Sequence, residues 1–286
     1  MPVFTGGTGR SGSTIVGHLL DHHPDLTLTR PMEVRFISGN DGVLDAVSVA
    51  RRNPARGIAA AQIAAERIRT RWFERAPDVG LHTSVSVEQI DAWVQDYLEG
   101  FADDPTAASI ALTGRIMDAV CDQIGAQRWV DTTPANARKG DRLTWLYPQA
   151  RVIAVVRDGR DVAASFVAQS FGPDDVFEAL DQWGERMQRI HRSLATAPEG
   201  SMLRVDLVDL VVRRRESTLA DILDFVGVPE SPEMRTWFDG NVTAASAHGG
   251  RWRSQFDHRT VREIDIRYRD ICSRLTESGV VIPHGD

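Results

Sequence analysis

The stretch at residues 150–156, ARVIAVV, constrains the fold more than any other part of the 286-residue sequence. It is an apolar run of strand length that only Arg151 interrupts. A strand with one face in water alternates apolar and polar residues, whereas a strand covered on both faces reads as a continuous apolar run. The run therefore predicts an α/β fold built on a buried parallel sheet with helices on both faces.

Short apolar strands alternate with helical patterns along the chain, which indicates βαβ units. Further strands are expected at residues 3–5, 26–28, 128–131 and 202–205. Apolar residues three and four positions apart predict helices at 13–22, 158–166, 176–197, 217–226 and 260–278. We expect a single domain over residues 1–286. Its segment 41–125 is interpreted as a helical insertion over the sheet, with helices at 45–51, 57–73, 87–101 and 106–124.

Composition restricts the partners and the compartment. With 33 Lys and Arg against 40 Asp and Glu the net charge is −7, so no nucleic-acid partner is expected and a bound anion needs a local cluster of cations. Cys121 and Cys272 lack metal-site spacing and are typical of a reducing compartment. No apolar run approaches the roughly 18 residues of a membrane span, and the N-terminus opens directly into a strand. We expect a cytoplasmic protein without a membrane span.

A glycine-rich loop at residues 6–14, GGTGRSGST, joins the first expected strand to the first expected helix. In the P-loop pattern G-x-x-x-x-G-K-[ST], Gly7, Gly12 and Thr14 are in register, but Ser13 replaces the lysine. That lysine reaches the β- and γ-phosphates of a nucleoside triphosphate. A loop without it fits a shorter 5′ group, such as a 5′-phosphosulfate.

The same loop offers an unusual density of anion donors. Backbone N–H groups at a strand–loop–helix turn converge beside the positive end of the helix dipole. Arg10 can bind phosphate or sulfate oxygens with two N–H groups at once. The expected binding residues of the loop are Gly9, Arg10, Ser11, Gly12, Ser13 and Thr14. The plainer alternative is a Gly/Ser turn in which Ser13 caps the helix.

A second candidate anion site follows the strand at 150–156, where the chain reads RDGRDVAASF at 157–166. Arg157 stands at the carboxyl end of the strand, where ligands bind in open α/β sheets. Ser165 follows eight residues later, about two helical turns along. Alone, this pattern also fits a solvated helix start with an Asp158–Arg ion pair. Together with the glycine loop it indicates two anion sites at one edge of the sheet.

These motifs resemble a known family. GRSGST at 9–14 and RDGRDVAASF at 157–166 look like the two nucleotide-binding elements of the sulfotransferases that use 3′-phosphoadenosine 5′-phosphosulfate (PAPS). RWVDTTPANAR at 128–138 is similar to a strand and loop facing the sulfate, RESTLADILDFVGV at 215–228 to the helix after a late strand, and GGRWRSQF at 249–256 to the C-terminal loop that closes on the 3′-phosphate. The N-terminal motif most resembles the bacterial branch related to tyrosylprotein sulfotransferases.

The resemblance implies a P-loop-like fold and a reaction. The sulfonate of PAPS would pass to a hydroxyl acceptor by in-line displacement, leaving adenosine 3′,5′-bisphosphate, with no metal. The acceptor would be a small molecule or glycolipid, and the segment 41–125 would shape its pocket. A homodimer is compatible with the sequence. The implied roles are sulfonate contact for Arg10, the phosphosulfate cradle for Gly12, Ser13 and Thr14, 3′-phosphate binding for Arg157 and Ser165, and closure of that site by Arg251 and Trp252.

A general base is the remaining catalytic requirement. In the related branch it is a glutamate shortly after the first helix, and Glu33 is the only glutamate before Glu66. The alternative is a surface glutamate paired with Arg30 or Arg35. Fallback bases are His22, His23 and His82.

Two positions depart from the family pattern. Thr132 stands where many relatives carry a lysine that assists the transferring sulfonate, so Arg138, Lys139 or Arg10 would have to supply that charge. No tyrosine occurs near Leu207, where relatives often contact the nucleotide with one. Two other functions therefore stay open: a metal-dependent small-molecule kinase on the same fold, and a nucleotide-binding regulatory protein without turnover.

Overall fold

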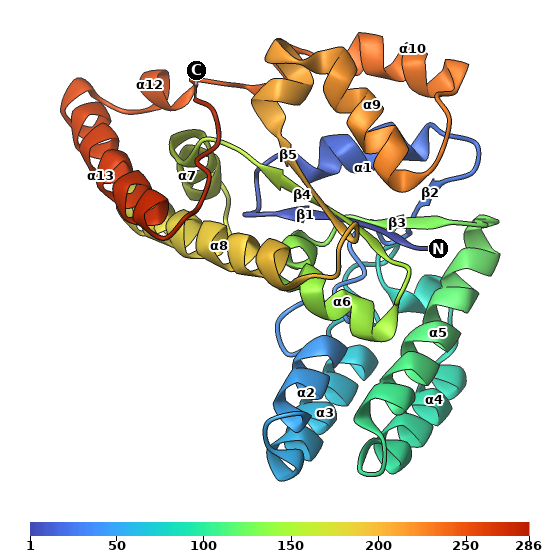
Figure 1. The fold of residues 1–286 in the computed structure, drawn as a ribbon. Helices are drawn as coiled ribbons and strands as arrows, with labels where there is room; N and C mark the ends of the chain where they lie inside the picture. The colour runs from blue at the N-terminus through green and yellow to red at the C-terminus, as the bar shows by residue number, and fades with distance from the viewer. Residues whose placement is uncertain (286) are drawn as a thin grey trace.

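A five-stranded parallel sheet forms the centre of the molecule (Figure 1). The computed structural model describes residues 1–285. The strands are β1 (Val3–Gly7), β2 (Thr27–Leu28), β3 (Trp129–Asp131), β4 (Arg151–Val156) and β5 (Met202–Asp206), in the order β2-β3-β1-β4-β5. All residues of β4 after Arg151 are fully buried between β1 and β5. The predicted α/β fold with a buried parallel sheet is confirmed.

Helices cover both faces of this sheet (Figure 1). One face carries α1 (Ser13–Asp21), α9 (Arg215–Val226) and α10 (Pro232–Asn241). The other carries the 3₁₀ helix η2 (Pro134–Lys139), α6 (Gly140–Leu146) and α8 (Val176–Thr196). Against α8 pack α7 (Gly159–Val167) and α13 (His258–Glu277). Shorter elements are η1 (Leu81–Thr83), the π-helical turn η3 (Asp209–Arg213), α11 (Ala244–Ala247) and α12 (Trp252–Gln255).

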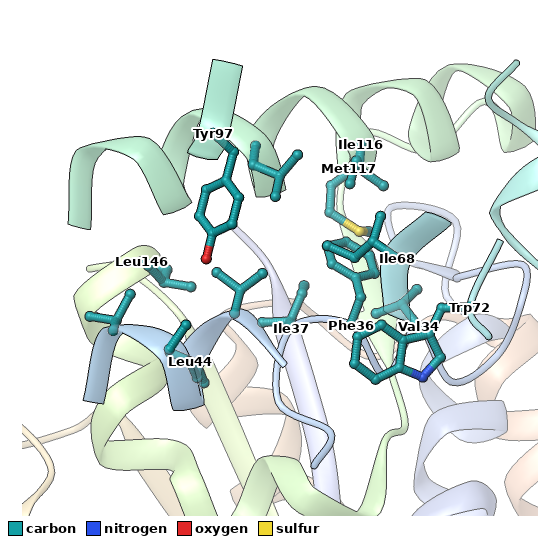
Figure 2. Packing of buried hydrophobic residues seen from close by; sticks show 14 of the residues in the cluster. Val34, Phe36, Ile37, Leu44, Ile68, Trp72, Tyr97, Ile116, Met117 and Leu146 are labelled. Atoms are coloured by element: carbon teal, nitrogen blue, oxygen red, sulfur yellow. The ribbon is translucent and has the colours of Figure 1, made fainter. Parts of the chain in front are cut away.

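The predicted helical segment forms two antiparallel pairs that extend away from the sheet (Figure 1). They are α2 (Val43–Ala50) with α3 (Pro54–Arg69), and α4 (Val87–Phe101) with α5 (Pro105–Ile124). Figure 2 shows how their apolar faces pack around Phe36 and Ile37 of the segment that follows β2. The helix expected at 57–73 begins earlier, at Pro54, because the Asn53 side chain accepts the N–H of Arg56 and proline suits a first turn.

A buried carboxylate at the end of β3 joins three segments. Asp131 is fully buried and accepts hydrogen bonds from the N–H of Val34 (3.0 Å), the hydroxyl of Thr133 (3.0 Å) and the side-chain amide of Asn136 (2.7 Å). The Asn136 amide also donates to the carbonyl of Thr5 in β1 (3.0 Å). Asp131 therefore holds the segment after β2 and the start of η2 against the central strand.

The burial of Asp131 predicts a pH-dependent stability. Burial raises its pKa from 3.8 to about 6, so between these values the folded chain binds more protons than the unfolded chain. The stabilising contribution is complete below about pH 4 and is lost as the pH rises through about 6. The measurement is the free energy of unfolding in urea, for wild type and for Asp131→Asn, at pH 4 and pH 7. The difference, wild type minus variant, should be greater at pH 4 than at pH 7 by on the order of 3 kcal/mol.

Because each variant is compared with wild type at the same pH, the titration of all other groups cancels in the difference. Asp103→Asn, at an exposed position without an ion pair among residues 1–285, is the matched control, and its stability difference from wild type should change far less over this range. A constant difference for Asp131→Asn, or one that grows with pH, would show that folding does not raise the pKa of Asp131.

Candidate functional site

A cavity of about 640 Å³, here called the loop cavity, lies at the carboxyl ends of β1, β3 and β4. Its lining comes from the glycine loop, the segment after β2, the segment after β3, and α7 and α8. Five arginines line it against the single carboxylate of Glu33: Arg10, Arg35, Arg138, Arg157 and Arg186. In a chain with a net charge of −7, this concentration of cations marks a site for an anionic ligand.

The glycine loop has the backbone of an anion cradle. Gly9, Arg10 and Gly12 all have positive φ, at 82°, 55° and 97°. A Cβ atom on Gly9 would lie 2.7 Å from the ring of Phe166, and one on Gly12 would lie 2.8 Å from Leu207. Gly12 is the residue that precedes α1, so Ser13 is the first helical residue and not the cap. Among residues 1–285, the N–H groups of Ser13 and Thr14 have no hydrogen-bond acceptor, and both residues line the cavity.

Five of the six predicted loop residues line the cavity. They are Gly9, Arg10, Gly12, Ser13 and Thr14. The sixth, Ser11, is fully buried beneath the loop against Gly7, and its hydroxyl has no hydrogen-bond partner among residues 1–285. Ser11 as a whole is outside the lining of the cavity, so its role in binding a ligand stays a prediction.

The two predicted anion sites are in direct contact. The Nε of Arg10 donates a hydrogen bond to the Oγ of Ser165, at 3.0 Å. The guanidinium of Arg157, 14% exposed, lies 3.4 Å from a carboxylate oxygen of Asp161 and donates to the carbonyl of His248 at 2.9 Å. The glycine loop and the start of α7 thus form one continuous basic wall.

The C-terminal segment reaches this wall through other residues than expected. His248 lines the loop cavity, and the same Asp161 oxygen that pairs with Arg157 accepts the N–H of Gly250 at 3.0 Å. The predicted Arg251 is exposed and Trp252 is buried, and neither lines the cavity as the structure describes it. The Trp252 ring packs on the guanidinium of Arg160 at 4.8 Å, which makes it part of the core beside α7.

Glu33 lies in the loop cavity and forms an ion pair. Its Oε2 accepts both the Nε of Arg35, at 2.7 Å, and the Nη2 of the same side chain. Among residues 1–285, its Oε1 has no hydrogen-bond partner and can accept a proton from a ligand. The three histidines proposed as fallback bases bond to backbone carbonyls outside this lining: His22, His23 and His82.

Of the cations considered as substitutes for a lysine at position 132, Arg138 lines the loop cavity and Lys139 does not. Thr132 is buried, and its hydroxyl donates to the carbonyl of Met32 at 3.1 Å. Lys139 pairs with Asp45 at 2.7 Å and is outside the lining of the loop cavity. Arg138 lines it, and burial together with the neighbouring arginines lowers the pKa of its guanidinium to about 10, so it stays charged at neutral pH.

Arg186 is a lining residue that sequence analysis did not identify. Its Nη1 donates to the carbonyl of Thr8 at 2.8 Å, and its guanidinium stacks on Phe166 at 4.7 Å. On sequence it is one of several arginines of a long amphipathic helix, and nothing distinguishes it from a solvated residue. Only the packing of α8 beside the glycine loop brings it into the site.

A second, more apolar cavity of about 330 Å³ adjoins the first, because Arg157 lines both. We call it the valine cavity. Its apolar lining is Leu207, Val208, Val211, Val212 and Ala244. Asp158, Asp161 and His284 also line it, so an apolar surface lies beside charged and polar side chains.

Helices α2 to α5 contribute no residue to the described lining of the loop cavity, so the role of segment 41–125 in shaping an acceptor pocket stays a prediction. Over residues 1–285, no helix has the length and hydropathy needed to cross a membrane. Within the same range, His, Cys, Asp and Glu side chains form no cluster of three or more suited to a metal ion.

Comparison with known proteins identifies the family. A model described as "Sulfotransferase family" matches residues 2–232. A search of curated proteins finds no match. The fold is similar to the sulfotransferase domain of the olefin synthase from Synechococcus PCC 7002, with 18% identity and a TM-score of 0.56 over 96% of this chain and 94% of that one.

Two further solved structures share the fold. The sulfotransferase domain from the curacin biosynthetic pathway is 17% identical, with a TM-score of 0.55 over 99% of both chains. Sulfotransferase STF1 from Mycobacterium tuberculosis H37Rv is 17% identical, with a TM-score of 0.50 over 93% of this chain and 76% of that one. Since the family match spans most of the sequence, the chain belongs to the sulfotransferase family, whose enzymes take the sulfonate from PAPS.

Proposed function

We propose that this enzyme transfers the sulfonate group of PAPS to a hydroxyl of a small-molecule or glycolipid acceptor. The observation that carries the proposal is the contact between Arg10 and Ser165, which joins two anion-binding elements in one cavity. PAPS carries anionic groups at both the 5′ and the 3′ position, so it requires two such elements side by side. The position of Glu33 in the cavity supports assignment to the branch related to tyrosylprotein sulfotransferases.

The residues present fit the nucleotide. The backbone of the glycine loop and Arg10 would hold the 5′-phosphosulfate, and Arg157 with Ser165 would hold the 3′-phosphate. The valine cavity, which shares Arg157 with the loop cavity, offers an apolar surface for adenine. Guanidinium groups suit this role because each can donate two parallel hydrogen bonds to phosphate or sulfate oxygens.

PAPS supplies the sulfonate, and its departing half is adenosine 3′,5′-bisphosphate. The Oε1 of Glu33 accepts the proton of the attacking hydroxyl, while Arg35 holds the other oxygen and orients the carboxylate. Arg10 and Arg138 stabilise the negative charge that develops on the leaving oxygen and the sulfonate. Positioning and charge stabilisation contribute most of the rate in the analogous phosphoryl transfers.

The kinase alternative is less well supported. In a kinase loop of this kind a lysine reaches the β- and γ-phosphates. Here Ser13 replaces that lysine, and Lys139, the only lysine of the sequence, is paired with Asp45 outside the loop cavity. A regulatory protein without turnover would suit the loss of the lysine at Thr132. However, Arg138 lines the cavity and can supply the positive charge that a lysine at position 132 would have supplied, which favours an active enzyme.

Calorimetric titration with adenosine 3′,5′-bisphosphate tests the nucleotide assignment, with Mg·ATP as the comparison ligand. We expect bisphosphate to bind and Mg·ATP to bind far more weakly. Arg157→Ala removes a charged hydrogen-bond donor and should weaken bisphosphate binding about 30-fold, which corresponds to about 2 kcal/mol.

Arg267→Ala is the control, since Arg267 pairs with Asp181 on the surface away from the cavity. Arg157→Lys keeps the positive charge but not the guanidinium that donates to the carbonyl of His248. Comparing it with Arg157→Ala separates the effect of losing the charge from the effect of disturbing that segment. Binding of Mg·ATP in preference to bisphosphate would reject the proposed function.

Replacement of Glu33 tests the general base. Glu33→Gln removes the proton acceptor but can still bond to Arg35, so the rate of sulfate transfer should fall by a factor of about 10² to 10⁴. The measurement uses radiolabelled PAPS with a panel of phenols and alcohols, and calorimetry should show unchanged bisphosphate affinity.

Glu263→Gln, on the surface of α13, should transfer sulfate at the wild-type rate. If Glu33→Gln also did so, Glu33 would be only the ion-pair partner of Arg35 and another group would accept the proton.

A further inference from the structure

A third cavity, of about 530 Å³, continues from the loop cavity, because Asn40 and Arg138 line both. We call it the arginine cavity. Its lining includes five cations against the carboxylates of Asp45 and Asp141: Arg138, Lys139, Arg142, Arg189 and Arg192. The proposed mechanism assigns Arg138 to the sulfonate. The nucleotide does not account for the other four cations, since its two anionic ends are matched by the glycine loop and Arg157, which do not line the arginine cavity.

The spacing of arginines on α8 links the two cavities. Arg186, Arg189 and Arg192 are three residues apart, so each is the neighbour of the next on the helix surface. Arg186 lines the loop cavity, whereas Arg189 and Arg192 line the arginine cavity. At a rise of about 1.5 Å per residue, this stripe extends about 9 Å along the helix. A ligand of ordinary metabolite size can span that length.

The carboxylates of the protein neutralise only part of this charge. Lys139, 13% exposed, pairs with Asp45 at 2.7 Å, and Arg142 lies 3.9 Å from Asp141. Arg189 pairs with Glu185 at 3.4 Å, and both of these side chains are exposed. Within residues 1–285, no carboxylate lies within ion-pair distance of Arg138 or Arg192.

The surplus cations also repel one another. Besides burial, the charges of Arg186 and Arg189 lower the pKa of Arg138, and those of Arg138 and Arg142 contribute to the lowered pKa of Lys139. Cations held this close to one another in a partly enclosed space are relieved by a bound anion. Cations that are only solvated gain nothing from being close to one another, whereas these five line one cavity.

We propose that the acceptor carries a phosphate, sulfate or carboxylate group that binds in the arginine cavity while its hydroxyl reaches Glu33 in the loop cavity. This inference rests on the proposed function and narrows its substrate class to small anionic hydroxyl compounds. Arg189 and Arg192 are then specificity-determining residues for the acceptor and have no contact with the nucleotide.

The test is calorimetry at constant ionic strength on protein saturated with adenosine 3′,5′-bisphosphate. Inorganic pyrophosphate is titrated as the phosphate or sulfate probe and malonate as the carboxylate probe. At least one should bind, and Arg189→Gln/Arg192→Gln should weaken it about tenfold or more, since each lost charged hydrogen-bond donor contributes this much. Both side chains are exposed, so the double variant should fold.

Arg259→Gln/Arg269→Gln is the matched control, because it also removes two exposed arginines of one helix, and neither of them lines the loop cavity or the arginine cavity. It should bind both probes as wild type does. The inference is overturned if neither probe binds, or if the two double variants bind them equally. Failure of the proposed function would appear separately, as absent bisphosphate binding in both double variants and in wild type; the probes would then be titrated into the free protein.

Discussion

The buried carboxylate of Asp131 is the interaction on which the site most depends. It fixes the end of β3 and, through Val34, the short segment that carries Glu33 and Arg35. Through Asn136 it also fixes the start of η2, at whose other end lies Arg138. A candidate base and a candidate sulfonate-binding cation therefore receive their positions from one group that does not line the loop cavity. Removing it would disturb both at once, although neither is its direct neighbour in sequence.

Electrostatics in this protein is a local property. The chain is acidic overall, yet the carboxyl edge of the sheet collects arginines from the glycine loop, the turn after β4, η2 and α8 in adjoining cavities. Short Debye lengths at physiological salt make such a cluster nearly independent of the distant acidic surface. The net charge therefore excludes a broad polyanion surface without excluding strong binding of a small anion.

Much of the fold could be predicted from the sequence, because apolar periodicity records burial directly, as it does in β4. Helix α10 was not predicted, although Ser231 before Pro232 is an ordinary start signal and the Ser231 side chain accepts the N–H of Met234. Within the site, motif spacing located Arg10, Arg157 and Ser165. It could not show that Ser11 turns under the loop, that Trp252 is used by the core, or that Arg186 enters the cavity. Those outcomes depend on side-chain direction and on helix placement, which spacing along the chain does not record.

The hydrogen bond between Arg10 and Ser165 also affects which ligands can bind, through the separation that it gives the two proposed anion-binding elements. It keeps two anion-binding elements at a set separation before any ligand arrives, so the ordering entropy of bringing them together is spent during folding. A ligand with two anionic groups at the matching separation binds as a bivalent ligand, and its second group engages at high effective concentration. A nucleotide with one anionic end, or free sulfate, gains no such advantage. Discrimination among the nucleotides of a cell can thus come from the distance between charges, with little need to read the base.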